Sequence, residues 1–138
     1  METSSRVRVA TYVLRAALGS MYLAHSVVLK IATFGFAGTA QFFVSIGLPA
    51  FVAYLTIAAE VLGGVLILAG VRVSAVSLAL IPILIGATVV HAPNGWVFNA
   101  NGGGWEYPVF LIAMSVVLAV LSWPAPRTTV AAGKVATV

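Results

Sequence analysis

The sequence predicts an all-α fold, a four-helix transmembrane bundle, from its composition, its long apolar segments and the placement of its charges. Of its 138 residues, 62% are hydrophobic and 7% are charged, whereas about 25% of the residues in a soluble domain are charged. The apolar residues fall in long runs, as they do in membrane-spanning helices. We therefore expect a multi-pass protein of the cell (plasma) membrane, embedded in the lipid bilayer.

Four segments are expected to cross the membrane, at residues 11–31, 51–71, 73–90 and 109–123. A spanning helix needs roughly 20 residues. The first three segments meet this length, and the fourth does so if Tyr107 and Pro108 form its first turn, where proline is tolerated. The sequence thus predicts a single membrane domain over residues 11–123, between an N-terminal segment (1–10) and a C-terminal tail (124–138).

The basic residues predict the orientation of the helices. With both termini in the cytoplasm, only Lys30 lies near the outer face, as the positive-inside rule favours. All five lysine and arginine residues outside the apolar segments are then cytoplasmic: Arg6, Arg8, Arg72, Arg127 and Lys134. The segments 33–49 and 91–108 are then outer loops. The first outer loop could contain a short helix lying in the membrane interface and capped by Thr39. The alternative is an irregular loop anchored by aromatic side chains.

The charge pattern and the absence of cysteine exclude several classes of function. The net charge is +4, but the basic residues occur singly, so no nucleic-acid partner is expected. The lack of cysteine excludes disulfide exchange, thiolate catalysis and cysteine-bound zinc or iron–sulfur clusters. His25, His91 and Glu106 match no recognised metal-binding spacing, and no metal is expected.

Polar residues at helical spacing predict a polar interior. Each of the first three segments carries one polar face. On the first segment this face is formed by Arg15, Gly19, Tyr22 and Ser26. On the second it is formed by Thr56, Glu60, Gly63 and Gly64, and on the third by Ser77, Leu84, Thr88 and His91. Ionisable residues within spanning helices usually face the bundle interior and are paired. Glu60 lies near the middle of its helix, and we expect it to be buried and partnered. Arg15 is expected to form a structural ion pair with it, with His25 as the alternative partner.

The remaining ionisable residues lie in the outer half of the predicted bundle. We expect them to border one outward-facing cavity with Glu60 as its floor and residues 94–105 as its roof. The candidate ligand-binding residues are His25, Lys30, Glu60, His91, Asn101, Trp105 and Glu106. The alternatives are that Lys30 only extends its ammonium group to the membrane surface and that His25 only bonds a neighbouring helix.

Three stretches of the chain resemble the DoxX family of small membrane proteins. They are RAALGSMYLAHSVVLK (15–30), GLPAFVAYLTIAAEVLGGVLILAGVR (47–72) and HAPNGWVFNANGGGWEYP (91–108). The resemblance extends from about Arg15 to Trp123. It implies a four-helix membrane bundle, and some members of the family are subunits of thiosulfate- or quinol-linked oxidoreductases.

The resemblance and the polar residues together predict a membrane subunit of an oxidoreductase system. Such a subunit would bind a quinone or a small substrate near the outer face. Electrons would come from a protein partner, because the chain itself lacks haem-protein, flavin-binding and cysteine motifs. The alternative is a non-catalytic scaffold or assembly subunit of a larger complex. A small-solute carrier is a third option, although no internal repeat supports it.

Overall fold

The computed structural model describes residues 3–124, and within them the chain forms helices joined by turns and one longer loop. The confirmed all-α architecture consists of α1 (Thr3–Leu23), the π-helical segment η1 (Ala24–Thr33), α2 (Gly35–Ser45), α3 (Ala50–Ala69), α4 (Val73–His91), the short 3-10 turn η2 (Ala92–Asn94) and α5 (Glu106–Leu121). Of the predicted C-terminal tail, residues 125–138 lie outside the described residues.

Three helical segments are long and apolar enough to cross a membrane, namely Thr3–Thr33, Ala50–Ala69 and Val73–Asn94. The fourth, α5, has 16 residues and includes Pro108 in its first turn, as the sequence predicts. Residues 3–10 are helical and continue into α1, because no glycine or proline interrupts the helix there.

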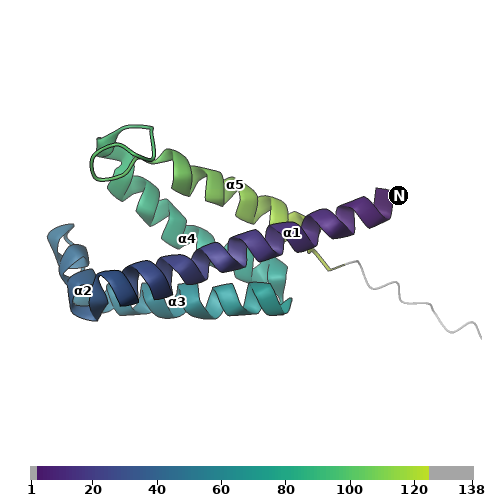
Figure 1. Ribbon diagram of the computed structural model, residues 1–138, viewed down its shortest axis with the longest axis horizontal. Helices are drawn as coiled ribbons and strands as arrows, with labels where there is room; N and C mark the ends of the chain where they lie inside the picture. The colour runs from purple at the N-terminus through teal and green to yellow at the C-terminus, as the bar shows by residue number, and fades with distance from the viewer. Residues whose placement is uncertain (1–2, 125–138) are drawn as a thin grey trace, which may run out of the picture.

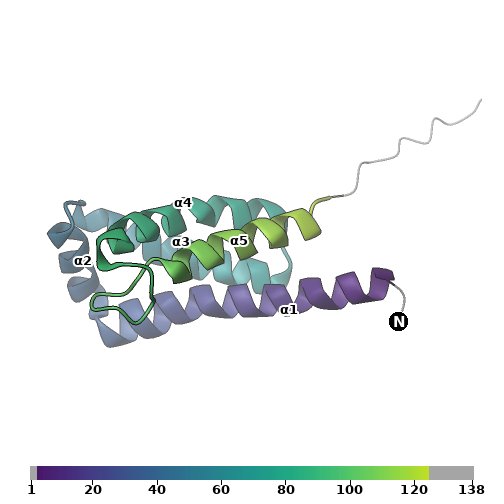
Figure 2. The same ribbon diagram turned by 90° about the horizontal axis from the view of Figure 1, so that it is seen from above.

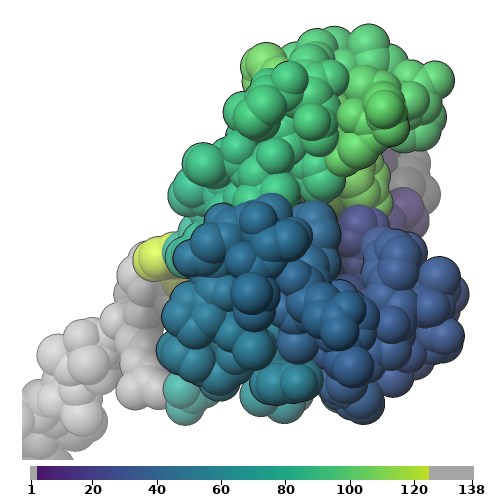
Figure 3. Space-filling model, turned by 90° about the vertical axis from the view of Figure 1, so that its left-hand side faces the viewer, coloured from purple at the N-terminus to yellow at the C-terminus, as the bar shows by residue number. Residues whose placement is uncertain are grey.

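The helices pack as two antiparallel pairs, α1 with α3 and α4 with α5. Figure 1 shows that the pairs lie close together at the end holding the N-terminus of α1, the α3–α4 turn and the end of α5; we call this the terminal end. In Figure 1 they diverge towards the opposite end, the loop end, and Figure 2 shows that this end holds α2 and the loop after α4. Figure 3 views the loop end, where α2 lies beneath that loop.

Glycine residues allow α3 to approach both of its neighbours closely. A Cβ atom at Gly64 would lie 2.9 Å from the carbonyl oxygen of Gly19 in α1. A Cβ atom at Gly63 would lie 2.7 Å from the Leu80 side chain in α4. The paired glycines therefore set the spacing of α1, α3 and α4, which is the use that small residues have in membrane bundles.

The outward faces of the helices are strongly apolar. Val13, Leu55, Leu62, Val89 and Val120 are each more than 60% exposed. The buried core is formed by other residues: Leu18, Tyr22, Ile67, Val73, Leu80, Leu84, Leu111 and Leu118. A soluble monomer rarely exposes apolar surface of this extent. Lipid contact accounts for it.

Arg15 does not form the predicted ion pair with Glu60. Its guanidinium group instead donates to the carbonyl oxygens of Ile67 (3.0 Å) and Leu68 (2.9 Å), the last turn of α3. The Ile67 carbonyl also accepts the Gly70 amide at 3.1 Å, and a cation is favourable beside the last carbonyls of a helix. The prediction fails because Arg15 lies too far along the helix from Glu60. The residues opposite Glu60 come after Leu23, and a rise of about 1.5 Å per residue already places Leu23 about 12 Å from Arg15.

The first loop contains a helix, α2, as the sequence suggests, but Thr39 does not cap it. The helix begins at Gly35, whose φ is +71°, and Thr39 lies in its middle. The Thr39 hydroxyl donates to the carbonyl oxygen of Lys30 at 2.8 Å. Thr39 therefore ties α2 to the π-helical segment.

Candidate functional site

Glu60 is buried in the middle of α3, where it is 4% exposed. Its Oε2 atom accepts hydrogen bonds from Ser26 Oγ and from Lys30 Nζ, each at 2.5 Å. Lys30–Glu60 is the single salt bridge within residues 3–124. A lone charge at this depth costs about 2.5–3.5 kcal/mol on insertion scales. The ion pair and the serine hydroxyl offset that cost. The sequence predicted Arg15 or His25 as the partner of Glu60, whereas the structure shows Lys30 in that role.

The π-helical segment positions this cluster, because Ser26 and Lys30 both belong to η1. In η1 the backbone bonds span five residues, as seen where the Phe34 amide donates to the Leu29 carbonyl at 3.0 Å. The Lys30 carbonyl oxygen receives the Thr39 hydroxyl. π-Helical turns are rare and are often found at functional sites.

Further hydroxyl groups extend the polar interior across the bundle. Tyr22 Oη and Ser115 Oγ, from α1 and α5, lie 3.3 Å apart. Ser77 of α4 is fully buried, and its hydroxyl has no hydrogen-bond partner among the described residues. Together with Glu60, these side chains come from all four long helices. The predicted polar interior is therefore present.

His25 connects this interior to the loop end of the bundle. Its ring stacks on Tyr107 of α5, with the ring centroids 5.7 Å apart and the planes 27° from parallel. His25 lies five residues before Lys30 in η1. His25 thus stands between the buried ion pair and the first turn of α5.

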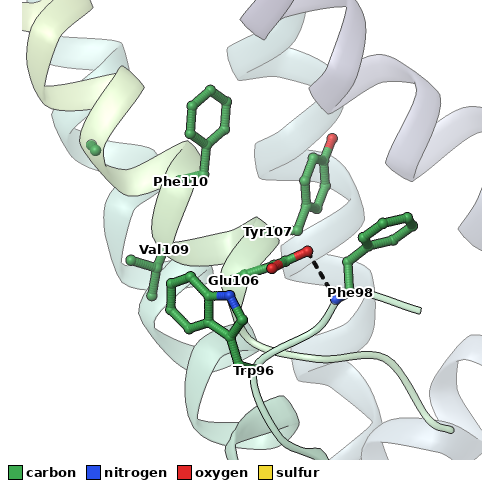
Figure 4. Close-up of a pocket in the computed structure, with 7 residues that line it drawn as sticks. Trp96, Phe98, Glu106, Tyr107, Val109 and Phe110 are labelled. Carbon is green, nitrogen blue, oxygen red and sulfur yellow. Dashed lines mark hydrogen bonds between the residues drawn. The ribbon is translucent and has the colours of Figure 1, made fainter. Parts of the chain in front are cut away.

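A groove of about 440 Å³ lies on the other side of Tyr107 (Figure 4). Its walls are aromatic and aliphatic, and Glu106 is the one acidic residue among them: Trp96, Phe98, Glu106, Tyr107, Val109, Phe110 and Ala113. Glu106 Oε1 accepts the backbone amide of Phe98 at 3.0 Å. Figure 4 shows this bond bridging α5 and the loop, with the Trp96 ring beside the carboxylate.

The loop between α4 and α5 is held by its own hydrogen bonds. Asn94 Nδ2 donates to the carbonyl oxygens of Gly102 and Gly103, both at 2.9 Å. His91 Nδ1 lies 3.0 Å from the Gly102 carbonyl oxygen. Gly102 and Gly103 have φ values of +83° and +79°, which other residues rarely adopt.

The two loop tryptophans pack against each other. The rings of Trp96 and Trp105 meet edge to face, with centroids 4.4 Å apart. The backbone reinforces this contact, since the Trp105 amide donates to the Gly95 carbonyl and the Glu106 amide to the Trp96 carbonyl. The loop therefore folds on itself and onto the start of α5, which places Trp96 and Phe98 at the groove.

The structure divides the predicted site into three clusters. Lys30 and Glu60 form the ion pair, with His25 nearby on η1. His91 and Trp105 stabilise the loop, and Asn101 is exposed, without a side-chain hydrogen bond within residues 3–124. Glu106 lines the groove. Within the same described range, no three histidine, aspartate or glutamate side chains could hold a metal ion together.

Several residues of these clusters were missed as site residues from the sequence. Phe110 follows Tyr107 by three residues and Glu106 by four, a spacing that places Phe110 beside each of them on α5 and could have been recognised. Trp96 and Phe98 reach the groove only through the fold of the loop. No local pattern indicates that contact.

The comparisons with known proteins agree on one family. The DoxX family profile matches residues 10–93. A Bacillus subtilis (strain 168) protein named "Putative oxidoreductase CatD" is 36% identical over 115 residues, which cover 80% of this chain and 78% of that protein. No solved structure matches the chain at a significant level.

Proposed function

Because the chain belongs to the DoxX family, we propose that it is a membrane subunit of an oxidoreductase system and that its groove at the loop end binds a quinone or a similarly flat small substrate. The name of the Bacillus subtilis relative supports the oxidoreductase association. In this proposal the protein resides in the plasma membrane with both termini in the cytoplasm, and a protein partner supplies or accepts the electrons.

The shape and the chemistry of the groove support the proposal that it binds a flat ring. Its volume of about 440 Å³ falls within the range of roughly 300–1,000 Å³ that is usual for small-molecule sites. Trp96, Tyr107 and Phe110 offer flat apolar surfaces for a ring. A quinone head group is a ring with two carbonyl acceptors, which the indole N–H and the phenol O–H can bind as donors.

Glu106 adds a proton-exchanging group at the edge of this groove. Reduction of a quinone to a quinol consumes two electrons and two protons. The electrons come from the partner enzyme, and a carboxyl group beside the head group can deliver or accept a proton. One carboxylate oxygen is bonded to the Phe98 amide. The other oxygen has no hydrogen-bond donor within residues 3–124 and would be available to a ligand.

Tryptophan fluorescence provides the test, because the tryptophans lie at opposite ends of the bundle. Trp96 and Trp105 are in the loop, whereas Trp123 follows α5 at the terminal end. In lipid nanodiscs, the Trp123→Phe variant retains only the loop tryptophans. A short-chain ubiquinone or menaquinone should quench their fluorescence in a saturable manner, and Glu106→Gln combined with Tyr107→Phe should weaken that saturation about tenfold or more.

The matched control is a variant that keeps only Trp123, with Trp96→Phe and Trp105→Phe. Quinone dissolved in the lipid quenches it without saturation. Equal and unsaturated quenching of both variants would refute a loop-end site. Purification in mild detergent with a stoichiometric protein partner and no extractable quinone would then favour a scaffold subunit.

A further inference from the structure

A second cleft lies at the terminal end of the bundle, on the opposite side of the molecule from the groove. Its volume is about 800 Å³. It is bordered by the first half of α1, the α3–α4 turn, the start of α4 and the end of α5. Three arginines line it, Arg8, Arg15 and Arg72, and among residues 3–124 no acidic residue lines it. We call it the arginine cleft.

Two buried hydroxyl groups in the arginine cleft have no partner. Ser74 is 7% exposed and lines the cleft together with Ser122. Neither hydroxyl has a hydrogen-bond partner within residues 3–124. A buried polar group without a partner costs about 1–3 kcal/mol. Because both residues line the same cleft, a ligand that accepts hydrogen bonds there would supply the missing partner after a small shift of the side chains.

The start of α4 supplies further donors to the same place. The helix begins at Val73 without a side-chain cap, so the amides of its first turn have no side-chain acceptor. The positive end of the helix dipole and the side chain of Arg72 favour an anion there. Arg72 also has a φ of +45°, an unfavourable conformation for this residue.

Arg15 contributes a positive charge to the cleft, and not all of its N–H donors are bonded within the described chain. Its Nε and Nη2 atoms bind the last carbonyls of α3, and its guanidinium carbon lies 5.4 Å from the centre of the Tyr12 ring. Nη1 makes no hydrogen bond to the described residues. Since a guanidinium group carries five N–H donors, Arg15 retains donors for an anion.

We propose that the arginine cleft binds a phosphate ester, with Arg8, Arg72 and Ser74 as its main contacts. The ligand is either the head group of an anionic phospholipid or a soluble phosphate compound. Leu78, Leu121 and Trp123 give the cleft an apolar wall. That wall suits the upper part of a lipid chain, and basic pockets between transmembrane helices are known lipid head-group sites.

Native mass spectrometry of the detergent-solubilised full chain tests this proposal. Titration with phosphatidylglycerol should give retained lipid at concentrations where phosphatidylcholine is not retained. Arg8→Gln and Arg72→Gln should each weaken this retention about tenfold or more. Arg6→Gln is the matched control, because it removes the same charge from the same helix without touching the cleft.

Serine variants separate a bound ligand from a general charge effect. Ser74→Ala should reduce retention of phosphatidylglycerol. Ser77→Ala removes another unpartnered buried hydroxyl of α4 outside the cleft and should leave retention unchanged. Two results together would identify the ligand as a soluble phosphate compound. Inorganic phosphate would raise the unfolding temperature of the wild type but not of Arg8→Gln, and phosphatidylglycerol would be retained no better than phosphatidylcholine.

Two outcomes would overturn the proposal. The first is that neither phosphatidylglycerol nor phosphate binds in preference to phosphatidylcholine or chloride. The second is an equal loss in Arg6→Gln and Arg8→Gln, which would show only general surface charge. Because the arginine cleft and the loop-end groove lie at opposite ends of the bundle, neither result bears on quinone binding.

Discussion

Lys30 and Glu60 form an ion pair inside the bundle, with 2.5 Å between Nζ and Oε2 and with side chains that are 17% and 6% exposed. The pair joins η1 to α3, and Ser26 donates to the same carboxylate oxygen. Two helices that are apolar on their outer faces are thus connected by a charged contact on their inner faces.

Replacing Glu60 tests how much this contact stabilises the bundle. Glu60→Ala leaves the Lys30 ammonium group without an acceptor, and we expect the free energy of unfolding to fall by about 3–5 kcal/mol. Glu60→Gln should be milder, since an amide oxygen can still accept from Ser26. Thermal unfolding in detergent measures both. The double variant Lys30→Met, Glu60→Met should recover part of the loss, and strictly additive losses would contradict a direct pair.

Gly64→Ala tests the crossing of α1 and α3. The added Cβ would meet the Gly19 carbonyl oxygen at 2.9 Å, and backbone cannot move aside as a side chain can. We expect a loss of about 1–3 kcal/mol in unfolding free energy. Gly86→Ala is the control, because its Cβ would have no neighbour within 4 Å. It should be neutral or stabilising by about 0.5–1 kcal/mol. Similar effects of the two substitutions would argue against close packing at Gly64.

Arg15→Met removes both hydrogen bonds that Arg15 donates to the last turn of α3. We expect the unfolding free energy to fall by about 1–2 kcal/mol, because Arg15 is only partly buried and water can replace one of the bonds. Arg15→Lys should recover part of this loss through its charge. The exposed Arg6 provides the comparison, and Arg6→Met should have no measurable effect. A thermal shift shared by both arginine variants would point to net charge instead.

Asn94→Ala should loosen the loop between α4 and α5. It removes two hydrogen bonds to the Gly102 and Gly103 carbonyls, each worth about 1 kcal/mol. Amide hydrogen exchange of residues 96–104, read by mass spectrometry, should therefore accelerate by roughly fivefold or more. Asn101→Ala in the same loop should leave exchange unchanged, since Asn101 is exposed and its side chain makes no bond within the described chain. Equal acceleration in both variants would count against the loop structure.

Cysteine labelling tests the orientation predicted from the basic residues. Because the chain contains no cysteine, a single cysteine introduced at Ser5 or at Asn99 is the one thiol that a maleimide can label. An impermeant maleimide added to intact cells should label the Asn99→Cys variant. The Ser5→Cys variant should react only after permeabilisation. Labelling of Ser5→Cys from outside would reverse the orientation.

The helices were predictable because apolar length and composition determine them. The runs at 51–71 and 73–90 lie within one or two residues of α3 and α4, and Gly70, with φ +79°, ends α3 as a left-handed glycine does. The burial of Glu60 was also predictable, since lipid offers a carboxylate no partner.

The partner of Glu60 was not predictable, because it depends on the relative shift of two helices and on the π-helical geometry of residues 24–33. A shift of one turn along η1 exchanges His25 for Lys30. The groove was missed for a different reason. Phe98 and Glu106 meet through a loop whose path depends on glycines with positive φ and on hydrogen bonds across it, and apolar periodicity carries no information on such a path.

The position of the ion pair along the chain has a consequence for biosynthesis. Lys30 and Glu60 are 30 residues apart, an interval that a ribosome translates in a few seconds at about 5–20 residues per second. Both belong to the first two spanning helices, so their contact requires neither α4 nor α5. The nascent chain can therefore neutralise both buried charges as soon as its second helix enters the lipid, while the remainder of the protein is still being made.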